Sequence, residues 1–504
     1  MKRFVPLYIT LICLICACNP VEESPNVVII LADDLGYGDP GIYNSDSKIS
    51  TPHIDALAAA GMRFTDAHSP SSVCTPTRYG LLTGRYAWRT ELKSSVLWSW
   101  DRPLIEEDRL TLPKMLKQQG YATACIGKWH LGWWWPSTSG GGYANRSLSL
   151  GQNGGEARIN LWQQIDFTKP MEGGPLAAGF DYYFGDDVPN FPPYVFFENN
   201  RLLGVPGPMK PDSMFGNPGP MVDGWDLTKV MPAITQKAVE YIHQESKKNK
   251  PFFLYFSLTA PHTPIAPDQS FIGKSEAGRY GDYVHQVDGS VGEVVDALRA
   301  SGMLENTLLI FTSDNGSPQR DGTNMNGKIA TVKAYGHDPS KPWRGMKGDI
   351  WEGGHRVPFI ASWPNRIPAG NTADQLVSQT DLMSSIAALL DIPIEAGAAV
   401  DGFDMSSILL GSQSESPIRE AIVHHSLDGT FAIRQGNWKL ILGKDSGGFS
   451  KNLASENTPV ETAGQLYDLS SDPGEKSNLY AQYPEKVEVL MALLEKYQAD
   501  GYSH

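Results

Sequence analysis

Cysteine is scarce in this chain, with five residues among 504. Cys13, Cys16 and Cys18 stand close to the N-terminus, so only Cys74 and Cys125 remain for the folded body. Two thiols are too few for a disulfide framework, although an exported protein would be free to build one. Cys125 lies in the apolar string YATACIG and is typical of a small buried hydrophobe, whereas Cys74 needs a separate reason for its presence.

Positive charge is also in short supply, because 42 basic residues face 56 acidic ones and leave a formal net charge of -14. Such a chain is not expected to bind nucleic acid, whose phosphates require a basic surface. An anionic substrate would need a local basic pocket. With 41% hydrophobic residues the chain can bury a large core, and its 50 glycines and 36 prolines predict long functional loops.

The apolar run at the N-terminus is short. It covers Phe4–Ala17, 14 residues, which is too few to span a bilayer, and it follows two basic residues. This pattern predicts a leader over residues 1–17 and an exported protein. The string Ile15-Cys16-Ala17-Cys18 resembles a bacterial lipobox, which implies a lipid on Cys18, membrane anchoring, and a place in the periplasm or on the outer-membrane or cell surface. The alternative is an ordinary signal peptide cut nearby.

Apolar runs alternate with amphipathic stretches over most of the length. The alternation predicts an α/β fold with a large, mostly parallel sheet sandwiched by helices, and we expect this catalytic domain over residues 25–410. After the linker GSQSESP at 411–417, short runs with turn signals predict a C-terminal subdomain over 418–504, made of a small antiparallel sheet and a terminal helix.

Polar clusters stand where four of the predicted strands end. They are Asp33-Asp34, Lys128-Trp129-His130, His262 and Asp314-Asn315. In open parallel sheets, ligands bind beyond the carboxyl ends of the strands. We therefore expect these clusters to meet in one site.

The most specific string is Cys74-Thr75-Pro76-Thr77-Arg78, continued by LLTGR at 81–85. It matches the sulfatase signature C-x-P-x-R followed by T-G-R, and the chain resembles the arylsulfatase family of the alkaline phosphatase superfamily over about residues 25 to 500. In character it is closest to the bacterial polysaccharide sulfatases. The resemblance implies that a maturation enzyme oxidises Cys74 to formylglycine (3-oxoalanine). One hydroxyl of the hydrated aldehyde can attack sulfur, and the other can expel sulfate by re-forming the aldehyde, an exit that a thiol lacks.

Four further residues offer only oxygen donors, which suit calcium or magnesium rather than zinc: Asp33, Asp34, Asp314 and Asn315. Taken singly, the aspartate pair could be a helix cap and SDNG a turn. In the related arylsulfatases the matching positions, together with the formylglycine, hold calcium. The resemblance therefore implies one Ca²⁺ per chain.

The resemblance also assigns the remaining polar residues. Arg78, Lys128 and Lys347 match the positions that bind sulfate, where fixed cations lower the barrier of a reaction that shifts negative charge. By resemblance, His130 takes a proton during sulfate elimination. His262, with or without Lys347, protonates the leaving alcohol; imidazoles titrate near neutrality and suit both tasks.

Asn315 separates two reaction types. Phosphodiester and phosphonate monoester hydrolases of the same superfamily usually carry histidine at this position and gather further imidazoles for transition metals. A neutral oxygen donor favours one hard ion and a sulfate ester. The phosphoester reaction, and a sulfatase for small aryl sulfates, remain as alternatives.

The substrate is expected to be a sulfated polysaccharide or oligosaccharide. Trp133-Trp134-Trp135 adjoin His130 in sequence and are candidates for stacking on sugar faces, although most buried indoles only fill volume. No serine aligns with the family's extra substrate contact, and Asp187 or Asn190 are alternatives. His424 and His425 are either substrate contacts or core residues. Algal polymers such as ulvan, carrageenan or fucoidan and animal glycosaminoglycans all stay open, and the aromatics alone would also suit a non-catalytic carbohydrate-binding module.

Overall fold

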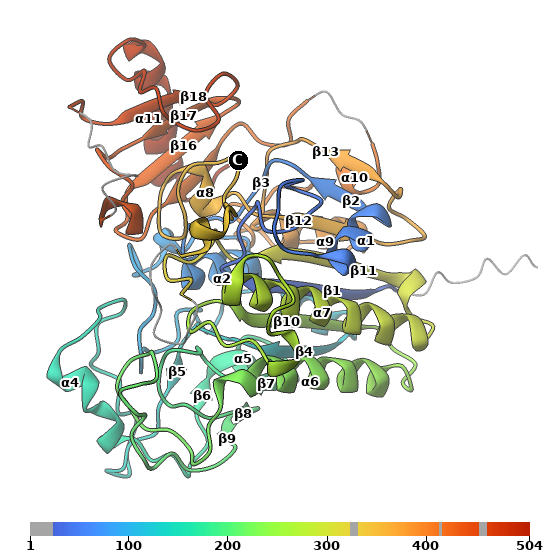
Figure 1. Ribbon diagram of the computed structural model, residues 1–504, viewed down its shortest axis with the longest axis vertical. Helices are drawn as coiled ribbons and strands as arrows, with labels where there is room; N and C mark the ends of the chain where they lie inside the picture. Colours follow the sequence, from blue (N-terminus) through green and yellow to red (C-terminus); the bar gives the residue numbers. More distant parts are fainter. Residues whose placement is uncertain (1–23, 323–330, 413–415, 453–460) are drawn as a thin grey trace, which may run out of the picture.

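The computed structural model describes residues 24–322, 331–412, 416–452 and 461–504 (Figure 1). The expected leader at 1–17 and its Cys18 lie outside the described residues. Within the ranges described, no helix is both long enough and apolar enough to cross a membrane.

The central element is a ten-stranded sheet in the order β13-β2-β12-β11-β1-β10-β4-β7-β8-β9. β1 (Asn26–Asp33) lies in the middle and runs parallel to β10 (Phe252–Pro261) and β11 (Thr307–Ser313). β4 (Ala122–Gly127) and β7 (Tyr182–Gly185) continue the parallel part. Antiparallel pairs join the outer strands, which are β2 (Met62–Phe64), β8 (Phe197–Glu198), β9 (Arg201–Leu202), β12 (Phe359–Ser362) and β13 (Asn371–Ala373), with β13 parallel to β2.

Both faces of the sheet are covered, which explains why its strands are continuous apolar runs. Val27, Ile29 and Leu31 of β1 belong to one hydrophobic cluster, and Val28 and Ile30 belong to the other. The first face packs against α2 (Cys74–Thr83), α3 (Leu112–Gln118) and α9 (Asp381–Leu389). The second face packs against α1 (Pro52–Ala59), α6 (Val230–Glu245) and α7 (Gly278–Ala300), and the last two lie along the sheet in Figure 1. The expected α/β sandwich is confirmed.

A separate antiparallel sheet forms at the C-terminal end, at the top of Figure 1. Its strands are β15 (Ile422–His425), β16 (Phe431–Gln435), β17 (Trp438–Ile441) and β18 (Gln465–Asp468), and α11 (Pro484–Asp500) packs on it. Tyr86 and Trp88 join the cluster between this sheet and α11. The small C-terminal sheet with its helix is therefore confirmed, and it is tied to the segment that follows α2.

Short elements complete the chain. They are β3 (Ala67–His68), β5 (Trp133–Trp134), α4 (Glu156–Ile159), β6 (Glu172–Gly173), α5 (Gly174–Ala177), α8 (Glu352–His355), β14 (Val377–Ser378) and α10 (Ser406–Leu409).

Candidate active site

The polar residues at the strand ends meet at one edge of the sheet. Asp33 ends β1, Lys128 follows β4, His262 follows β10 and Asp314 follows β11. These four strands are neighbours in the order β11-β1-β10-β4, so their carboxyl ends deliver the side chains side by side.

Cys74 is the first residue of α2, and Arg78 lies one turn later on the same side of the helix. The Cys74 Sγ atom is 3.7 Å from Asp33 Oδ1 and 3.9 Å from Asp34 Oδ1, and its side chain is 1% exposed. The helix ends at Gly84, whose φ of 62° and whose close approach to Ala399 both exclude a larger residue. The TGR part of the motif thus ends the helix that Cys74 begins.

Buried cations face the buried carboxylates. Lys128 Nζ donates to both oxygens of Asp33 at 2.8 Å, and Lys347 Nζ lies 2.7 Å from Asp34 Oδ1. Burial raises the pKa of the Asp33 carboxyl, but Lys128, His262 and Arg78 outweigh it and hold that pKa well below its usual range. Asp33 is therefore ionised at any physiological pH.

The oxygen donors fit a hard cation. Asn315 Nδ2 donates to Asp34 Oδ1 at 2.7 Å, while Asn315 Oδ1 is buried and has no hydrogen-bond partner among the described residues. The backbone N–H of Asp34 donates to Asp314 Oδ1 at 3.0 Å. The backbone of Asp34 is left-handed, with a φ of 67°. Ligand atoms of Asp33, Asp34, Cys74 and His262 lie within 4.8 Å of one another. The unpaired amide oxygen of Asn315 and the carboxylates of Asp33, Asp34 and Asp314 together form an oxygen-rich site of the kind that binds calcium.

His130 is held by its backbone. It has φ 56°, its N–H donates to Asp187 Oδ1 at 3.1 Å, and its ring Nε2 lies 2.9 Å from the carbonyl oxygen of Leu97. Burial and then the charge of Lys128 hold the pKa of His130 well below its usual value. The ring is neutral at neutral pH and can accept a proton.

His262 reaches the centre beside Asp34, with its Nε2 3.7 Å from Asp34 Oδ2. Its Nδ1 pairs with the carbonyl of Thr263. Burial, and then the charge of Lys347, lower the pKa of His262 to about 4. This ring is also neutral until negative charge arrives beside it.

A pocket of about 460 Å³ opens over the centre. Cys74, His130, His262 and Lys347 form its floor, together with Asp34. Its walls come from segments far apart in the sequence: Val73, Val96, Trp98, Asn153, Val188, Asn190, Phe191, Phe215, Asn217, Thr263, Pro318, Gln319, Arg320, Leu427 and Phe449.

Two of the wall residues, Trp98 and Phe191, belong to no sequence motif that predicts a place in the site. Their rings lie 5.2 Å apart, and the Phe191 ring meets His130 edge-on at 5.7 Å. Each stands in a loop, in an aromatic-rich string without a motif, so only the fold reveals that both face the pocket.

The tryptophan cluster after His130 lies elsewhere, and the expected stacking on sugar is wrong for Trp133 and Trp135. These indoles are 1% and 2% exposed and belong to the core, because Trp133 pairs in a two-stranded ribbon and donates its Nε1–H to Asp187. Trp134 stacks on Tyr143, outside the pocket.

The structure also distinguishes between Asp187 and Asn190 as substrate contacts, and between the two roles open to His424 and His425. Asn190 lines the pocket, whereas the Asp187 carboxylate is engaged with the His130 backbone. His424 and His425 are buried and stand apart from the pocket lining, so both are core residues.

Residues 25–392 match the family model described as Sulfatase. An N-acetylgalactosamine-6-O-sulfatase of Bacteroides thetaiotaomicron is 34% identical over 98% of each chain, and human arylsulfatase A is 32% identical over 91% of this chain and 84% of its own. A solved Bacteroides thetaiotaomicron structure, from work on the metabolism of multiple glycosaminoglycans, aligns with TM-score 0.80 and 33% identity over 95% of this chain and all of that one. The chain therefore belongs to the sulfatase family and is a hydrolase of sulfuric esters.

Proposed function

We propose that this sulfatase removes 6-O-sulfate from N-acetylgalactosamine residues of glycosaminoglycan fragments. The observation that carries the proposal is the similarity over 98% of both chains to a bacterial N-acetylgalactosamine-6-O-sulfatase. Relatives with the corresponding mammalian name, such as the dog enzyme at 29% identity over 93% of this chain, support the same choice.

The pocket supports a sugar substrate. Its volume of about 460 Å³ lies within the ~300–1,000 Å³ typical of small-molecule sites. Trp98 and Phe191 offer aromatic surface for the apolar face of a pyranose. The amides of Asn190 and Asn217 stand in the same walls, and Asn190 Oδ1 is a buried acceptor without a partner in the described structure. It suits a hydroxyl or acetamide N–H of the sugar.

Residue 74 supplies the nucleophile in this proposal. Burial and then the charge of Asp314 raise the pKa of the Cys74 thiol well above its usual value, so the unmodified side chain is a poor nucleophile. Oxidised to formylglycine and hydrated, residue 74 supplies a hydroxyl nucleophile and a route for releasing sulfate. The protein's own contribution is to hold this residue at the start of α2 beside Asp33 and Asp34.

Asp33, Asp34, Asp314, Asn315 and residue 74 would hold one calcium ion. When bound, the ion supplies positive charge that orients the sulfate group and neutralises its oxygens. Asn315 places a neutral amide where an imidazole would favour a transition metal. This choice of ligand supports a sulfate ester rather than a phosphoester as the substrate.

Three buried cations complete the positive surroundings. Lys347 lines the pocket, while Arg78 and Lys128 stand behind the carboxylates they pair with. Fixed positive charge at a buried site stabilises the negative charge that moves onto the sulfate oxygens during attack.

The two histidines stand near the reacting atoms in different places. His130 is neutral and has a buried Nδ1 without a partner among the described residues, so it is suited to take a proton from residue 74. A bound sulfate ester brings negative charge beside His262, which shifts the pKa of that imidazole upward and prepares it to protonate the leaving alcohol. Lys347 is within the same pocket and can share that task.

Export and anchoring form a separate part of the proposal. The run Phe4–Ala17 and the lipobox-like string before Cys18 support export to the periplasm or cell surface with a lipid on Cys18. Mass spectrometry of the mature N-terminus tests this. A lipid-modified Cys18 is expected, and a mature N-terminus at any other residue would contradict the anchor.

The substrate is tested with a panel of defined sulfated saccharides. It should include 6-O- and 4-O-sulfated N-acetylgalactosamine, 6-O-sulfated N-acetylglucosamine, carrageenan, ulvan and fucoidan fragments, 4-nitrophenyl sulfate and 4-nitrophenyl phosphate. We expect the highest kcat/KM on 6-O-sulfated N-acetylgalactosamine. A preference for an algal fragment would contradict the proposed sugar specificity. Faster cleavage of 4-nitrophenyl phosphate than of 4-nitrophenyl sulfate would contradict the proposed sulfatase reaction.

A further inference from the structure

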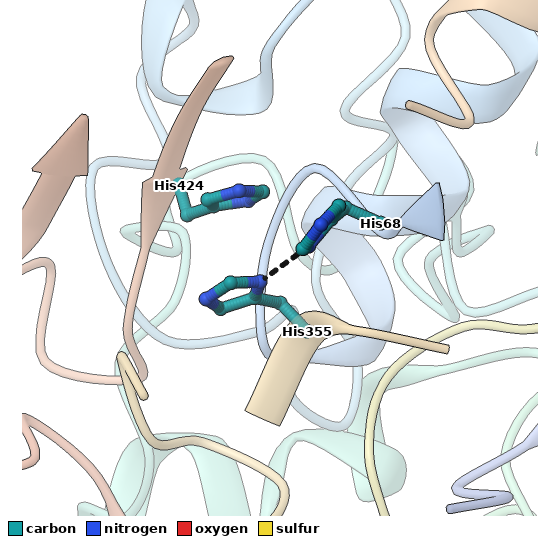
Figure 2. Close-up of side chains that lie close together, drawn as sticks. All are labelled: His68, His355 and His424. Carbon is teal, nitrogen blue, oxygen red and sulfur yellow. Dashed lines mark hydrogen bonds between the residues drawn. The ribbon is translucent and has the colours of Figure 1, made fainter. Parts of the chain in front are cut away.

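Three buried imidazoles from distant segments meet inside the protein (Figure 2). His68 ends β3, His355 ends α8 and His424 lies in β15 of the C-terminal sheet. His68 Nδ1 is 3.0 Å from His355 Nδ1, and the His355 and His424 rings stack with centroids 3.8 Å apart and planes 14° from parallel. All three side chains are fully buried.

Charged groups close this imidazole cluster at both ends. His68 Nε2 lies 2.8 Å from Asp66 Oδ1, and Lys439 Nζ lies 3.1 Å from His355 Nε2. One proton arrangement satisfies the carboxylate, the pair of imidazoles and the ammonium. It supplies no N–H to the Ile350 carbonyl, 3.1 Å from His355 Nε2, and no acceptor to Arg434 Nη1, 3.3 Å from His68 Nε2. His68 donates to the carboxylate and accepts from His355 Nδ1–H, and His355 Nε2 accepts from the Lys439 ammonium. Both rings are neutral in this arrangement.

The arrangement differs from a metal site. An ion lies in the plane of each imidazole that ligates it, and two rings stacked in parallel, such as His355 and His424, have no such point in common. The ammonium of Lys439 beside the cluster further opposes a cation.

The cluster holds the segment that leads into Cys74. Ser69 N–H donates to the carbonyl of His355 at 2.8 Å, and the ring Nδ1 of His424 lies 3.2 Å from the Ser69 carbonyl oxygen. His424 comes from β15, so the C-terminal sheet reaches this segment through one side chain. When His424 donates its Nδ1–H to the Ser69 carbonyl, its Nε2 is unprotonated and has no partner among the described residues.

Ser72 connects this segment to the loop that carries Lys347. Its N–H donates to the His425 carbonyl at 3.3 Å, and its own carbonyl accepts from the Gly348 N–H at 2.8 Å. The 69–72 segment ends two residues before Cys74. It therefore joins β15 on one side to the loop that carries Lys347 on the other.

We propose that the imidazole cluster is a positioning element for the catalytic centre, through which the C-terminal sheet fixes residue 74 and Lys347. None of the three imidazoles lines the pocket, so any effect on the reaction is indirect, and the 69–72 segment provides the connection to residue 74. The proposal rests on the roles given above to Cys74 and Lys347. A displacement of about 1 Å at reacting groups can cost ~10²-fold in rate, so a small shift of this segment would be visible in kcat.

The test replaces His424 in the full chain. His424→Phe keeps a flat stacking ring and loses the contact with Ser69, whereas His424→Gln keeps an N–H that can reach the Ser69 carbonyl. His425→Phe is the matched control, because His425 is buried in the same strand and its ring nitrogens have no partner among the described residues. Turnover of 4-nitrophenyl sulfate is expressed per formylglycine, counted by mass spectrometry, and per folded protein.

We expect kcat of the His424→Phe enzyme to fall by about 10-fold or more with KM nearly unchanged. His424→Gln should recover most of that loss, and His425→Phe should keep kcat even if its Tm falls. A purely structural role would lower the Tm of His424→Phe and leave kcat per folded, formylglycine-bearing molecule unchanged, which would overturn the proposal. Equal losses in the Phe and Gln variants, or stoichiometric zinc that disappears in His424→Phe, would also overturn it. Failure of the wild-type enzyme on every sulfate ester would instead contradict the proposed function.

Discussion

The guanidinium of Arg78 donates twice to one oxygen of Asp314, from Nε at 3.1 Å and from Nη2 at 2.7 Å. Both side chains are fully buried, and the same Nη2 is 3.3 Å from Asp33 Oδ1. Because Arg78 lies one helical turn after Cys74, this contact joins the start of α2 to the ends of β1 and β11.

Replacing Arg78 should affect both stability and rate. Arg78→Lys cannot reproduce the planar, two-donor contact, and Arg78→Ala leaves the buried Asp314 carboxylate without its cationic partner, which costs about 3–5 kcal/mol in the free energy of unfolding. We expect kcat/KM to fall by about 10²-fold or more in both variants. Urea unfolding and steady-state kinetics measure the two effects.

The control for Arg78 is Arg89→Lys. Arg89 also makes a buried two-donor contact, to Asp401, with Nε 2.9 Å from Oδ2 and Nη2 2.7 Å from Oδ1, but it stands apart from the pocket. This variant should lose stability and keep kcat. Wild-type kcat/KM in Arg78→Lys would contradict a role for Arg78 at the sulfate.

Removal of divalent cations should abolish activity. After chelation and dialysis, calcium is expected to restore turnover better than zinc, because the side-chain donors at Asp33, Asp34, Asp314 and Asn315 are all oxygens. Calcium should also raise Tm, since a ligand present at about 100 times its Kd stabilises the folded state by roughly 2.7 kcal/mol. Asp314→Asn should remove both responses. Recovery with zinc alone would show that the ligand assignment is wrong.

Cys74 should carry formylglycine in protein from cells that contain the maturation enzyme. Peptide mass spectrometry detects the aldehyde, and fully active protein with an intact thiol would contradict the mechanism. Cys74→Ala is expected to abolish turnover and leave the fold intact. Cys125→Ala removes the other described thiol, which is equally buried, and should keep activity at a stability cost of about 1 kcal/mol.

His262→Ala should separate two kinds of leaving group. A sugar alkoxide needs a proton to depart, so the variant is expected to be slower by ~10²- to 10⁴-fold on a carbohydrate sulfate. An activated phenolate leaves with little help, so 4-nitrophenyl sulfate should lose much less.

His130→Ala provides the comparison. Elimination of sulfate from the enzyme is common to both substrates, so this variant should be impaired on the two alike. Pre-steady-state measurements should then reveal accumulated sulfated enzyme. Equal losses on sugar and aryl sulfates in His262→Ala would assign the proton to Lys347 or to solvent.

Much of the fold and of the polar centre at the strand ends could be predicted, because a parallel sheet places the ends of its buried strands at one edge. Asp33, Lys128, His262 and Asp314 each follow an apolar run, which is a local signal. Lys347 follows no strand, and only the family resemblance predicts its place at the site. It reaches the site because its loop is held by Ser72 and Ser317.

The pocket walls could not be predicted in the same way. Trp98 and Phe191 stand 93 positions apart in loops, and their packing is a tertiary property. Trp133 and Trp135 have the same side chain as Trp98 and lie nearer in sequence to His130, yet they fill the core. Composition predicts how many indoles a chain has, and only the three-dimensional arrangement decides which of them contact a ligand.

The burial of Cys74 has a consequence for the proposed conversion to formylglycine. The residue is 1% exposed in the folded protein, so an oxidising enzyme has no access to it there. Asp314 and Lys347, whose charges lie beside it in the folded centre, are synthesised more than two hundred positions later. If residue 74 becomes formylglycine as proposed, the conversion is therefore expected while the chain is still growing or unfolded, and a molecule that folds first would keep its thiol.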